Sequence, residues 1–318
     1  EAMVVVDLDK TLVASGFDVL PVQAAHPGRL RLVLAPGEAP RLRALNLAWR
    51  LVAEGRPPAA AMAGPEALDP KYFTPAEMKA LLQNHAKKHP KLVRFYDLTT
   101  YTGTAPTHEG RHIYAIKISD NPGVDEDEPN VCLVAQHHAR EVNSPVMVTE
   151  TIAAILANYP TDPAVKRMVE EFELWFVPMV NPDGTNWVFT KDNWWRKNRR
   201  DNGGGYYGVD PNRNYPFRWR KCGYSTRPGS NIYCGPTAGS EPCVQTVMAL
   251  SDKRHFTRLL DFHSSGREVL YTYSPCTTNV PAARRNLLTR VMKELSRAAN
   301  YRTRNPSASG EEPEWQLA

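Results

Sequence analysis

The fold class can be predicted from the segment Asn130-Val-Cys-Leu-Val-Ala-Gln-His-His-Ala-Arg-Glu141. Residues 130–136 form a short, mainly apolar run with polar residues at both ends, which is typical of a buried β-strand. The polar segment 137–141 follows it, and residues 144–158 then repeat apolar side chains with the period of an α-helix. A buried strand that leads through polar residues into a helix predicts one unit of an α/β domain.

Further strands and helices are predicted on both sides of this unit. Residues 75–88 have an amphipathic helical pattern, with Thr74 as the N-cap and Pro75 in the first helical position. Another helix is predicted at 281–299. Strand patterns occur at residues 112–118, 174–180 and 259–263. This alternation predicts an α/β fold in which a mixed central β-sheet is flanked by helices.

The first part of the chain, residues 1–66, differs in composition and is rich in Ala, Leu, Arg, Val and Pro. Residues 12–20 weakly resemble residues 42–51, and residues 29–34 alternate as a half-buried strand does. We interpret residues 1–66 as two small α/β modules, followed by the main domain at 67–318. One irregular α/β subdomain is the alternative interpretation, because repetition at this length is a weak signal.

Metal chemistry is suggested by the spacing of His138 and Glu141. On the first turn of a helix, residues three apart lie on one side, so an imidazole and a carboxylate can converge on one ion. Catalytic zinc commonly takes two His and one Glu and leaves a fourth position for water. His263 ends an apolar strand and is the candidate third ligand, because functional residues of open α/β sheets gather at the carboxyl ends of strands.

Six motifs, in order, carry a resemblance to a known family. The chain from about residue 70 to 318 resembles the zinc carboxypeptidases of the A, B and T kind. His138-Ala-Arg-Glu141 looks like the zinc motif of that family, and Asp261-Phe-His-Ser264 looks like its third-ligand segment. The other four segments are Val180-Asn-Pro-Asp-Gly184, Asn193-Trp-Trp-Arg-Lys-Asn-Arg199, Val209-Asp-Pro-Asn-Arg-Asn-Tyr215 and Tyr233-Cys-Gly-Pro-Thr-Ala-Gly-Ser-Glu-Pro242.

The resemblance implies a role for each matching residue. It implies that His138, Glu141 and His263 bind one zinc ion, and that Arg196 stabilises the developing oxyanion. Asn212 and Arg213 would hold the free carboxylate of a peptide C-terminus, a task that suits the planar fork of arginine. Arg140 and Ser264 would complete the substrate site, whereas His137 is expected to be structural. The implied function is hydrolysis of C-terminal peptide bonds by metal-activated water.

The last residues depart from the pattern of the family. Pro306 stands where the resemblance places a substrate-capping Tyr, and the general-base Glu would lie beyond Ala318. We expect the chain to be a truncated enzyme. One alternative is a non-catalytic protein that binds zinc and peptide tails, and another is a related zinc amidase or cell-wall peptide hydrolase. Residues 1–66 stand where the pro-segment of the family stands, and they are expected to be either an inhibitory pro-segment or a permanent accessory domain.

Composition and charge exclude several classes of function. The chain has 42% hydrophobic and 23% charged residues, as globular soluble proteins do. The net charge is +5. The sequence contains no basic run with interleaved aromatic residues, so nucleic-acid binding is not expected. The apolar runs are too short to span a bilayer, so a membrane-spanning helix is not expected. We expect a monomer whose substrates are peptide or protein C-termini.

Cysteines and an acidic loop give two further predictions. Cys222 and Cys234 flank a Gly/Ser/Pro-rich loop, and we predict a disulfide between them, with all five cysteines reduced as the alternative. A disulfide implies an oxidising compartment and therefore a secreted or extracellular protein, although the chain begins Glu1-Ala2-Met3 without the charged-then-apolar pattern of a signal peptide. Cys132 is predicted to be a buried free thiol. The carboxylates between Asp120 and Glu128 predict a calcium site, and a solvated acidic loop is the alternative.

Overall fold

The computed structural model describes residues 2–7, 18–20, 29–34, 39–45, 49–54, 67–264, 268–270 and 282–304. The chain divides into two compact units. One unit consists of Gly64–Asp201 and Gly239–Ser264 and contains the largest sheet. The other consists of Glu1–Ala63, Asn202–Ala238 and Ser265–Ala318.

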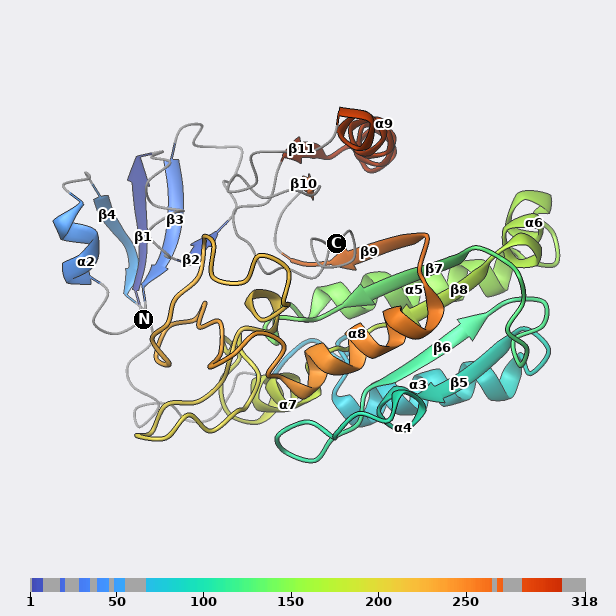
Figure 1. Ribbon diagram of the computed structural model, residues 1–318, viewed down its shortest axis with the longest axis horizontal. Helices are drawn as coiled ribbons and strands as arrows, with labels where there is room; N and C mark the ends of the chain where they lie inside the picture. The colour runs from blue at the N-terminus through green and yellow to red at the C-terminus, as the bar shows by residue number, and fades with distance from the viewer. Residues whose placement is uncertain are drawn as a thin grey trace. The chain divides into compact units, whose positions relative to one another are not determined.

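The first unit is built on a five-stranded mixed sheet (Figure 1). Its strand order is β5-β6-β8-β7-β9. Antiparallel pairs join β5 to β6 and β6 to β8, whereas β7 pairs in parallel with both β8 and β9. The strands are β5 (Val93–Asp97), β6 (Tyr114–Ile118), β7 (Asn130–Ala135), β8 (Glu173–Val177) and β9 (Arg258–Phe262). The predicted mixed central sheet is therefore confirmed.

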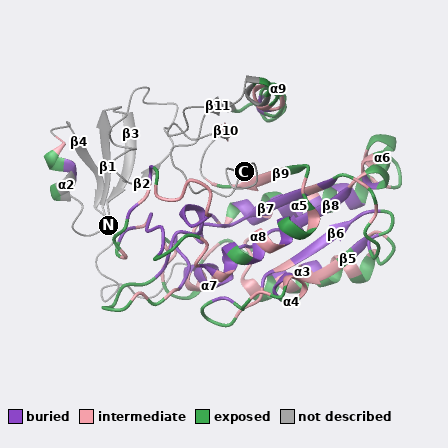
Figure 2. Cartoon of the chain, in the orientation of Figure 1, coloured by how far each residue is buried: buried purple, intermediate pink, exposed green. Residues whose placement is uncertain are grey.

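Both faces of the three inner strands, β6, β8 and β7, are buried (Figure 2). Because side chains alternate along a strand, Leu133 and Phe176 point to one face, and Cys132 and Trp175 point to the other. The first face packs against α3 (Pro75–Lys88), α5 (Asn143–Asn158) and α6 (Pro163–Glu171). Burial on both faces explains why residues 130–135 are apolar almost without alternation.

Two more helices belong to the same unit. Helix α4 (Leu98–Thr102) packs against β5 and β6, and α8 (Pro242–Arg254) packs against α4. In Figure 1, α8 crosses the view in front of the sheet. A further helix, α7 (Pro182–Thr190), follows β8 and contacts α3.

The start of α3 shows how closely local sequence determines a helix end. The Thr74 hydroxyl accepts a hydrogen bond from the Glu77 amide, and the Glu77 carboxylate accepts one from the Thr74 amide. This reciprocal arrangement satisfies two amides that a helix start leaves without partners, and Pro75 has no amide hydrogen to satisfy. The predicted helix 75–88 is confirmed in both bounds.

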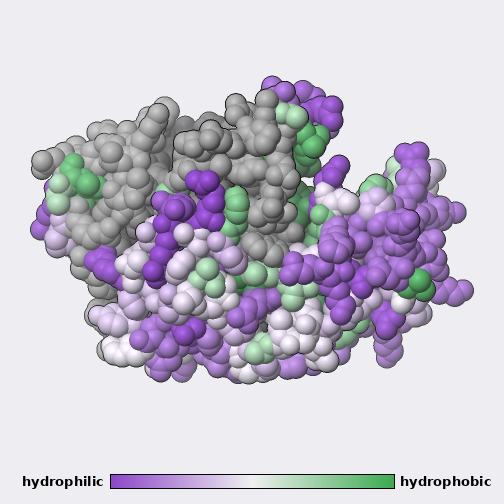
Figure 3. Space-filling model, viewed as in Figure 1, coloured by the Kyte–Doolittle hydropathy of each residue, from purple (hydrophilic) through white to green (hydrophobic). Residues whose placement is uncertain are grey.

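The surface around α6 is hydrophilic, as the right-hand end of Figure 3 shows. Val169 on this helix is buried, while Lys166, Arg167 and Glu170 are exposed. This division of the helix explains why a short amphipathic segment covers one end of the sheet. Among the helices in the described ranges, none has the length and apolar character that a membrane crossing requires.

The second unit contains a four-stranded sheet of order β2-β3-β1-β4 near the N-terminus. Strand β1 pairs antiparallel with both β3 and β4, so strands from the two proposed modules share one sheet. A shared sheet favours the alternative of a single α/β subdomain, and the division into two modules stays a prediction. The elements are β1 (Ala2–Asp7), β2 (Asp18–Leu20), β3 (Arg29–Leu34), α2 (Ala39–Ala44) and β4 (Trp49–Glu54).

The same unit includes a parallel strand pair and a long helix, namely β10 (Glu268–Leu270), α9 (Ala282–Ala299) and β11 (Arg302–Arg304). Helix α9 confirms the pattern at 281–299 to within one residue. The proposed domain boundary at residue 66, together with Cys276 and the tail with Pro306, lies outside the described residues. That boundary stays a prediction.

The predicted disulfide between Cys222 and Cys234 is wrong. Cys222 is disulfide-bonded, but Cys234 is a buried free thiol. The Cys234 sulfur lies 3.4 Å from Nε of Arg220, which donates a hydrogen bond to it. Closeness in sequence favoured the wrong partner, because a disulfide requires specific Cα separation and Cβ orientation. Cys132 is a buried free thiol, as predicted.

Candidate metal centre

The predicted ligands His138 and Glu141 lie in the turn that joins β7 to α5. Gln136, which follows the last strand residue, has a φ of 60° and turns the chain away from the sheet. The Glu141 amide then donates a hydrogen bond of 3.1 Å to the His138 carbonyl, which closes the turn. The two residues were expected on the first turn of the helix, but α5 begins only at Asn143. A hydrogen-bonded turn also brings residues three apart together, so the expected convergence occurs without the helix.

The third ligand reaches this turn because of the register of two parallel strands. Ala135 at the end of β7 pairs with Phe262 at the end of β9, so His263 emerges beside residue 136. Both strands therefore end at the same edge of the sheet, where ligand sites of open α/β sheets lie. The backbone amide of Ser264 donates a hydrogen bond of 3.0 Å to Oε2 of Glu141, which joins the two segments directly.

The ligand atoms of the three residues converge. Nδ1 of His138 lies 2.7 Å from Oε1 of Glu141 and 3.1 Å from Nδ1 of His263, which is 2.8 Å from Oε2 of Glu141. A tetrahedral ion with ligands at ~2.1 Å would separate them by ~3.4 Å, close to these values. His138 and Glu141 are buried, whereas the side chain of His263 is 31% exposed. The residues present therefore fit a zinc ion that is approached from the side of His263.

The electrostatics of the three residues also suit a cation. Burial disfavours the charged form of Glu141, but the imidazoles of His138 and His263 outweigh burial and hold the pKa of its carboxyl well below the ordinary value. For His263, burial acts to lower the pKa, but Asp261 and Glu141 raise it well above the ordinary value. Two Nδ1 atoms that face each other beside an ionised carboxylate form a donor set that suits a metal ion.

Arg196 is held beside the ligands by the segment that contains it. The Arg196 carbonyl accepts a hydrogen bond of 2.9 Å from the Ala139 amide, and its Nη1 lies 3.9 Å from Oε1 of Glu141. The guanidinium of Arg199 lies 3.5 Å from the ring centre of Trp187 and 4.7 Å from that of Trp195. Stacked arginine of this kind fixes the backbone of its segment. Arg196 and Arg199 are both buried, so this segment is not a solvated basic face.

The start of helix α7 is hydrogen-bonded to the turn that carries His138 and Glu141. Asn181 accepts a hydrogen bond from the Gly184 amide, and it donates one of 3.0 Å to the His137 carbonyl. A Cβ atom on Gly184 would lie 2.8 Å from Cβ of Ala139 and would overlap the Lys197 carbonyl oxygen. The absence of a side chain at Gly184 therefore lets the helix, the turn and the arginine segment meet.

Gly184→Ala should destabilise the fold by about 1–3 kcal/mol, because an added methyl group in a filled interior forces its neighbours apart. The measurement is the urea midpoint, compared with Thr190→Ala on an exposed position of the same helix. The control should change stability by less than about 0.5 kcal/mol. Equal midpoints for wild type and Gly184→Ala would show that the packing around Ala139 can yield.

The Glu241 carboxylate connects three segments of the chain through hydrogen bonds, and one of them is the segment that contains Arg196. The Glu241 side chain has no exposed area. One oxygen accepts hydrogen bonds from His108 at 2.8 Å and Asn198 at 2.6 Å, and the other accepts from Ser240 at 2.6 Å and Arg200 at 3.2 Å. Burial acts to raise the pKa of this carboxyl, but these donors outweigh burial and lower it. A buried carboxylate with four donors fixes the relative positions of the segments that supply them.

Glu241→Gln should cost about 1.5–3 kcal/mol at neutral pH, since hydrogen bonds to a charged acceptor are lost. The folded-state pKa of Glu241 is lowered, so its contribution is complete above the unfolded-state pKa of ~4.3 and disappears as the pH falls through the folded-state value. Urea midpoints between pH 6 and about 3 should therefore fall more steeply for wild type than for Glu241→Gln. Parallel pH profiles would contradict this role for Glu241.

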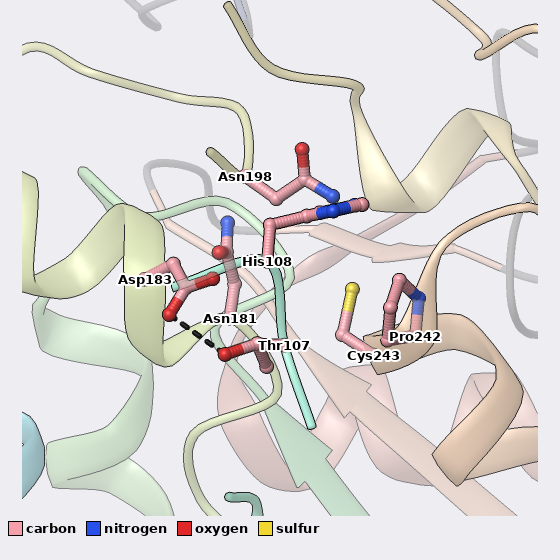
Figure 4. Close-up of a pocket in the computed structure, with 7 residues that line it drawn as sticks. All are labelled: Thr107, His108, Asn181, Asp183, Asn198, Pro242 and Cys243. Carbon is pink, nitrogen blue, oxygen red and sulfur yellow. Dashed lines mark hydrogen bonds between the residues drawn. The ribbon is translucent and has the colours of Figure 1, made fainter. Parts of the chain in front are cut away.

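A small cavity lies beside this network (Figure 4). None of the three ligand residues lines it, so it is distinct from the metal centre. Its polar side chains hold the fold together, as the Thr107 hydroxyl does by donating a 2.7 Å hydrogen bond to the Asp183 carboxylate. The lining residues are Thr107, His108, Asn181, Asp183, Asn198, Pro242 and Cys243.

The predicted carboxylate clamp lies in the second unit, and Arg140 lies in the first. Asn212 and Arg213 are buried in a short 3₁₀ helix, η2 (Pro211–Arg213), whose start is capped by Asp210. Nε of Arg213 donates a hydrogen bond of 2.9 Å to the Gly223 carbonyl. Arg140 donates one of 3.5 Å to the Trp194 carbonyl. The substrate-binding roles of these residues and of Ser264 stay predictions.

The acidic loop brings three carboxylates together. One oxygen each from Asp120, Glu126 and Glu128 lie within 4.8 Å of one another. Burial, together with the neighbouring Glu126 and Asp120, raises the pKa of Glu128, so a proton competes with a cation there. Ser119 and Asn121 also donate hydrogen bonds to Glu126. Calcium binding at this loop stays a prediction.

Sequence reasoning missed Asp261 as a member of the centre. Its carboxylate lies 2.8 Å from Nε2 of His263 and 3.1 Å from Nδ1 of His137. The signal was present in the sequence, because residues two apart on a strand face the same way and Asp261 stands two before His263. His137 is buried within the fold, as its predicted structural role requires.

Comparisons with known proteins agree with this arrangement. The family model described as zinc carboxypeptidase, peptidase family M14, matches residues 78–314. A zinc carboxypeptidase of Saccharothrix mutabilis subsp. capreolus is 36% identical over 154 residues, which cover 48% of this chain and 34% of that protein. Metallocarboxypeptidase A of Arthroderma otae is 34% identical over 215 residues, which cover 65% of this chain and 50% of that protein.

The solved carboxypeptidase A of Helicoverpa armigera superposes with a TM-score of 0.80 at 22% identity. The match covers 99% of this chain and 85% of that structure, which establishes a shared fold. Fold and site together define an α/β protein with a His–Glu–His metal centre. The chain belongs to the zinc carboxypeptidase family, which implies zinc as the metal. It spans between 34% and 50% of the length of the two curated relatives described above.

Proposed function

We propose that this protein is a zinc metallocarboxypeptidase that removes C-terminal residues from peptides or proteins. The observation that carries the proposal is the convergence of His138, Glu141 and His263, with ligand atoms 2.7–3.1 Å apart. Membership of the zinc carboxypeptidase family supports the same reaction class.

The three ligand residues would hold zinc through two imidazole nitrogens and one carboxylate. When bound there, zinc lowers the pKa of water toward ~7 and polarises a carbonyl group.

The other residues bind and orient the substrate. Arg196 presents a fixed cation close to Glu141, where it can stabilise negative charge that develops on the scissile carbonyl oxygen. We assign Asn212 and Arg213 to the terminal carboxylate, because a guanidinium pairs with a carboxylate through two parallel hydrogen bonds. Arg140 and Ser264 are assigned to neighbouring parts of the substrate.

The test uses the full-length protein and compares one short peptide that has a free C-terminal carboxylate with the same peptide carrying a C-terminal amide. A carboxypeptidase should bind and cleave only the free form, one residue at a time, with one zinc ion per chain. Arg213→Gln should weaken binding of the free form and leave zinc content unchanged. Preferential cleavage of the amide would indicate the amidase class, and tail binding with zinc but no turnover would indicate a non-catalytic binding protein.

We also propose that the protein works as a monomer in an oxidising, extracellular compartment. The disulfide of Cys222 supports this location, because disulfides persist mainly outside the reducing cytosol. Thiol titration of the protein purified without reductant, together with its mass in solution by light scattering, tests both statements.

A further inference from the structure

A second layer of polar side chains lies directly behind the metal ligands. The carboxylate of Asp261 uses both oxygens there, with Oδ2 2.8 Å from Nε2 of His263 and Oδ1 3.1 Å from Nδ1 of His137. The His137 side chain has no exposed area, and that of Asp261 is 2% exposed. The hydrolysis proposed above uses neither residue directly.

The chemistry of Asp261 determines which nitrogen of His263 can bind a metal. An ionised carboxylate only accepts hydrogen bonds, so Nε2 of His263 must carry a proton to donate to it. In a neutral imidazole the other nitrogen then has a free lone pair, and this nitrogen is Nδ1. Nδ1 is also the atom that faces His138 and Glu141. The position of Asp261 therefore selects the tautomer that a metal requires.

His137 holds the carboxylate in the orientation that this task needs. Its Nδ1–H donates to the oxygen that His263 does not use, so rotation of the carboxylate would break one of the two hydrogen bonds. The His137 and His263 rings lie 6.0 Å apart with 23° between their planes, and each contacts one oxygen of the Asp261 carboxylate. The His137 backbone is fixed in turn, because its carbonyl accepts a hydrogen bond from Asn181.

We propose that Asp261 and His137 are positioning residues that set the tautomer and orientation of His263 and thereby strengthen zinc binding. The inference rests on the proposed function, in that it takes His263 to be a zinc ligand. Partners of this kind raise the basicity of a ligand histidine, and their loss weakens metal binding by about 10–100-fold.

The experiment measures the zinc dissociation constant by competition with a chromogenic chelator. Asp261→Asn should raise this constant by about 10–100-fold, since an amide accepts through only one of its two terminal atoms. His137→Leu, which removes the donor but keeps similar bulk, should raise it by a smaller factor. His137→Asn should recover most of the affinity, because the Asn amide nitrogen stands where Nδ1 of His stands.

A matched control separates this effect from general damage to the fold. Asp183→Asn changes another buried carboxylate of the same unit, whose hydrogen-bond donors within the described residues are Thr107, Arg111 and the Glu109 amide. It should lower the urea midpoint but change the zinc dissociation constant by less than about threefold. In the cobalt-substituted protein, Asp261→Asn should also shift the visible absorption bands, which report ligand geometry, and Asp183→Asn should not.

Four outcomes separate this inference from the proposed function. A wild-type protein that binds no zinc would overturn both. Zinc binding by folded Asp261→Asn within about twofold of wild type would overturn this inference alone, and so would two zinc ions per wild-type chain with one lost in His137→Leu. If Asp261→Asn does not fold, the comparison of His137→Leu with His137→Asn decides, and equal affinities for those two variants would refute the role of the pair.

Discussion

Replacing Glu141 with alanine should weaken zinc binding by at least ~10²-fold and should abolish peptide hydrolysis. Glu141 contributes the only carboxylate of the His138–Glu141–His263 group, and its two oxygens lie 2.7 and 2.8 Å from the two ligand nitrogens. If about 10 kcal/mol of zinc-binding free energy is shared by three ligands, losing one costs ~3 kcal/mol, or at least ~10²-fold in affinity. The true loss should be larger, because the remaining imidazoles lose the negative charge that favours a cation.

The comparison variants for this prediction lie nearby in the chain. Glu141→Gln keeps the volume but removes the charge, so it should lose zinc nearly as completely as Glu141→Ala. Glu150→Ala, on an exposed position of α5, should bind zinc like the wild type. Zinc content by atomic emission and chelator competition measure both. Retention of one zinc ion per chain in folded Glu141→Ala would move the metal site away from this group.

Local patterns in the sequence identified the elements that position the site. The apolar run at 130–136 and the capped helix at 75–88 were predicted because neighbouring residues alone determine strand burial and helix ends. The strand expected at 174–180 was too long, because β8 ends at Val177 just before Pro178, which has no amide hydrogen for a strand ladder. Strand β5 was missed because its sequence, Val-Arg-Phe-Tyr-Asp, is half polar and it lies at the edge of the sheet.

Partner choice across long separations was much less predictable. His263 could be named as a ligand because it follows a strand, yet the approach of its Nδ1 to His138 depends on the register of β9 against β7. The sequence motif that contains Glu241 gave it no role of its own, although its carboxylate accepts a hydrogen bond from His108, which is 133 residues away. The pairing of Cys222 failed for the same reason. Composition and periodicity report what a residue can do, whereas the fold decides which residue it meets.

Glu173→Ala should destabilise the protein by about 3–5 kcal/mol, a large part of the ~5–15 kcal/mol that holds a typical domain folded. The Glu173 carboxylate forms an ion pair with Lys117 inside the sheet, where the two side chains are 0% and 1% exposed. It also accepts a hydrogen bond of 3.0 Å from the Glu126 amide. Its removal leaves the Lys117 ammonium buried without its counter-charge, which is the costly step. Urea denaturation at neutral pH measures the loss.

The double variant Lys117→Met/Glu173→Met tests whether the cost arises from the stranded charge rather than from lost packing. Replacing both partners of a buried ion pair with apolar side chains of similar size is often neutral or stabilising, so the double variant should recover most of the stability that Glu173→Ala loses. Lys166 and Glu170 on α6 form an exposed pair 3.7 Å apart, and Glu170→Ala should cost less than about 1 kcal/mol. If Glu173→Ala and Glu170→Ala cost the same, the Lys117–Glu173 pair must be hydrated in solution. If the double variant is as unstable as Glu173→Ala, the packing of the two side chains against the sheet matters more than their charges.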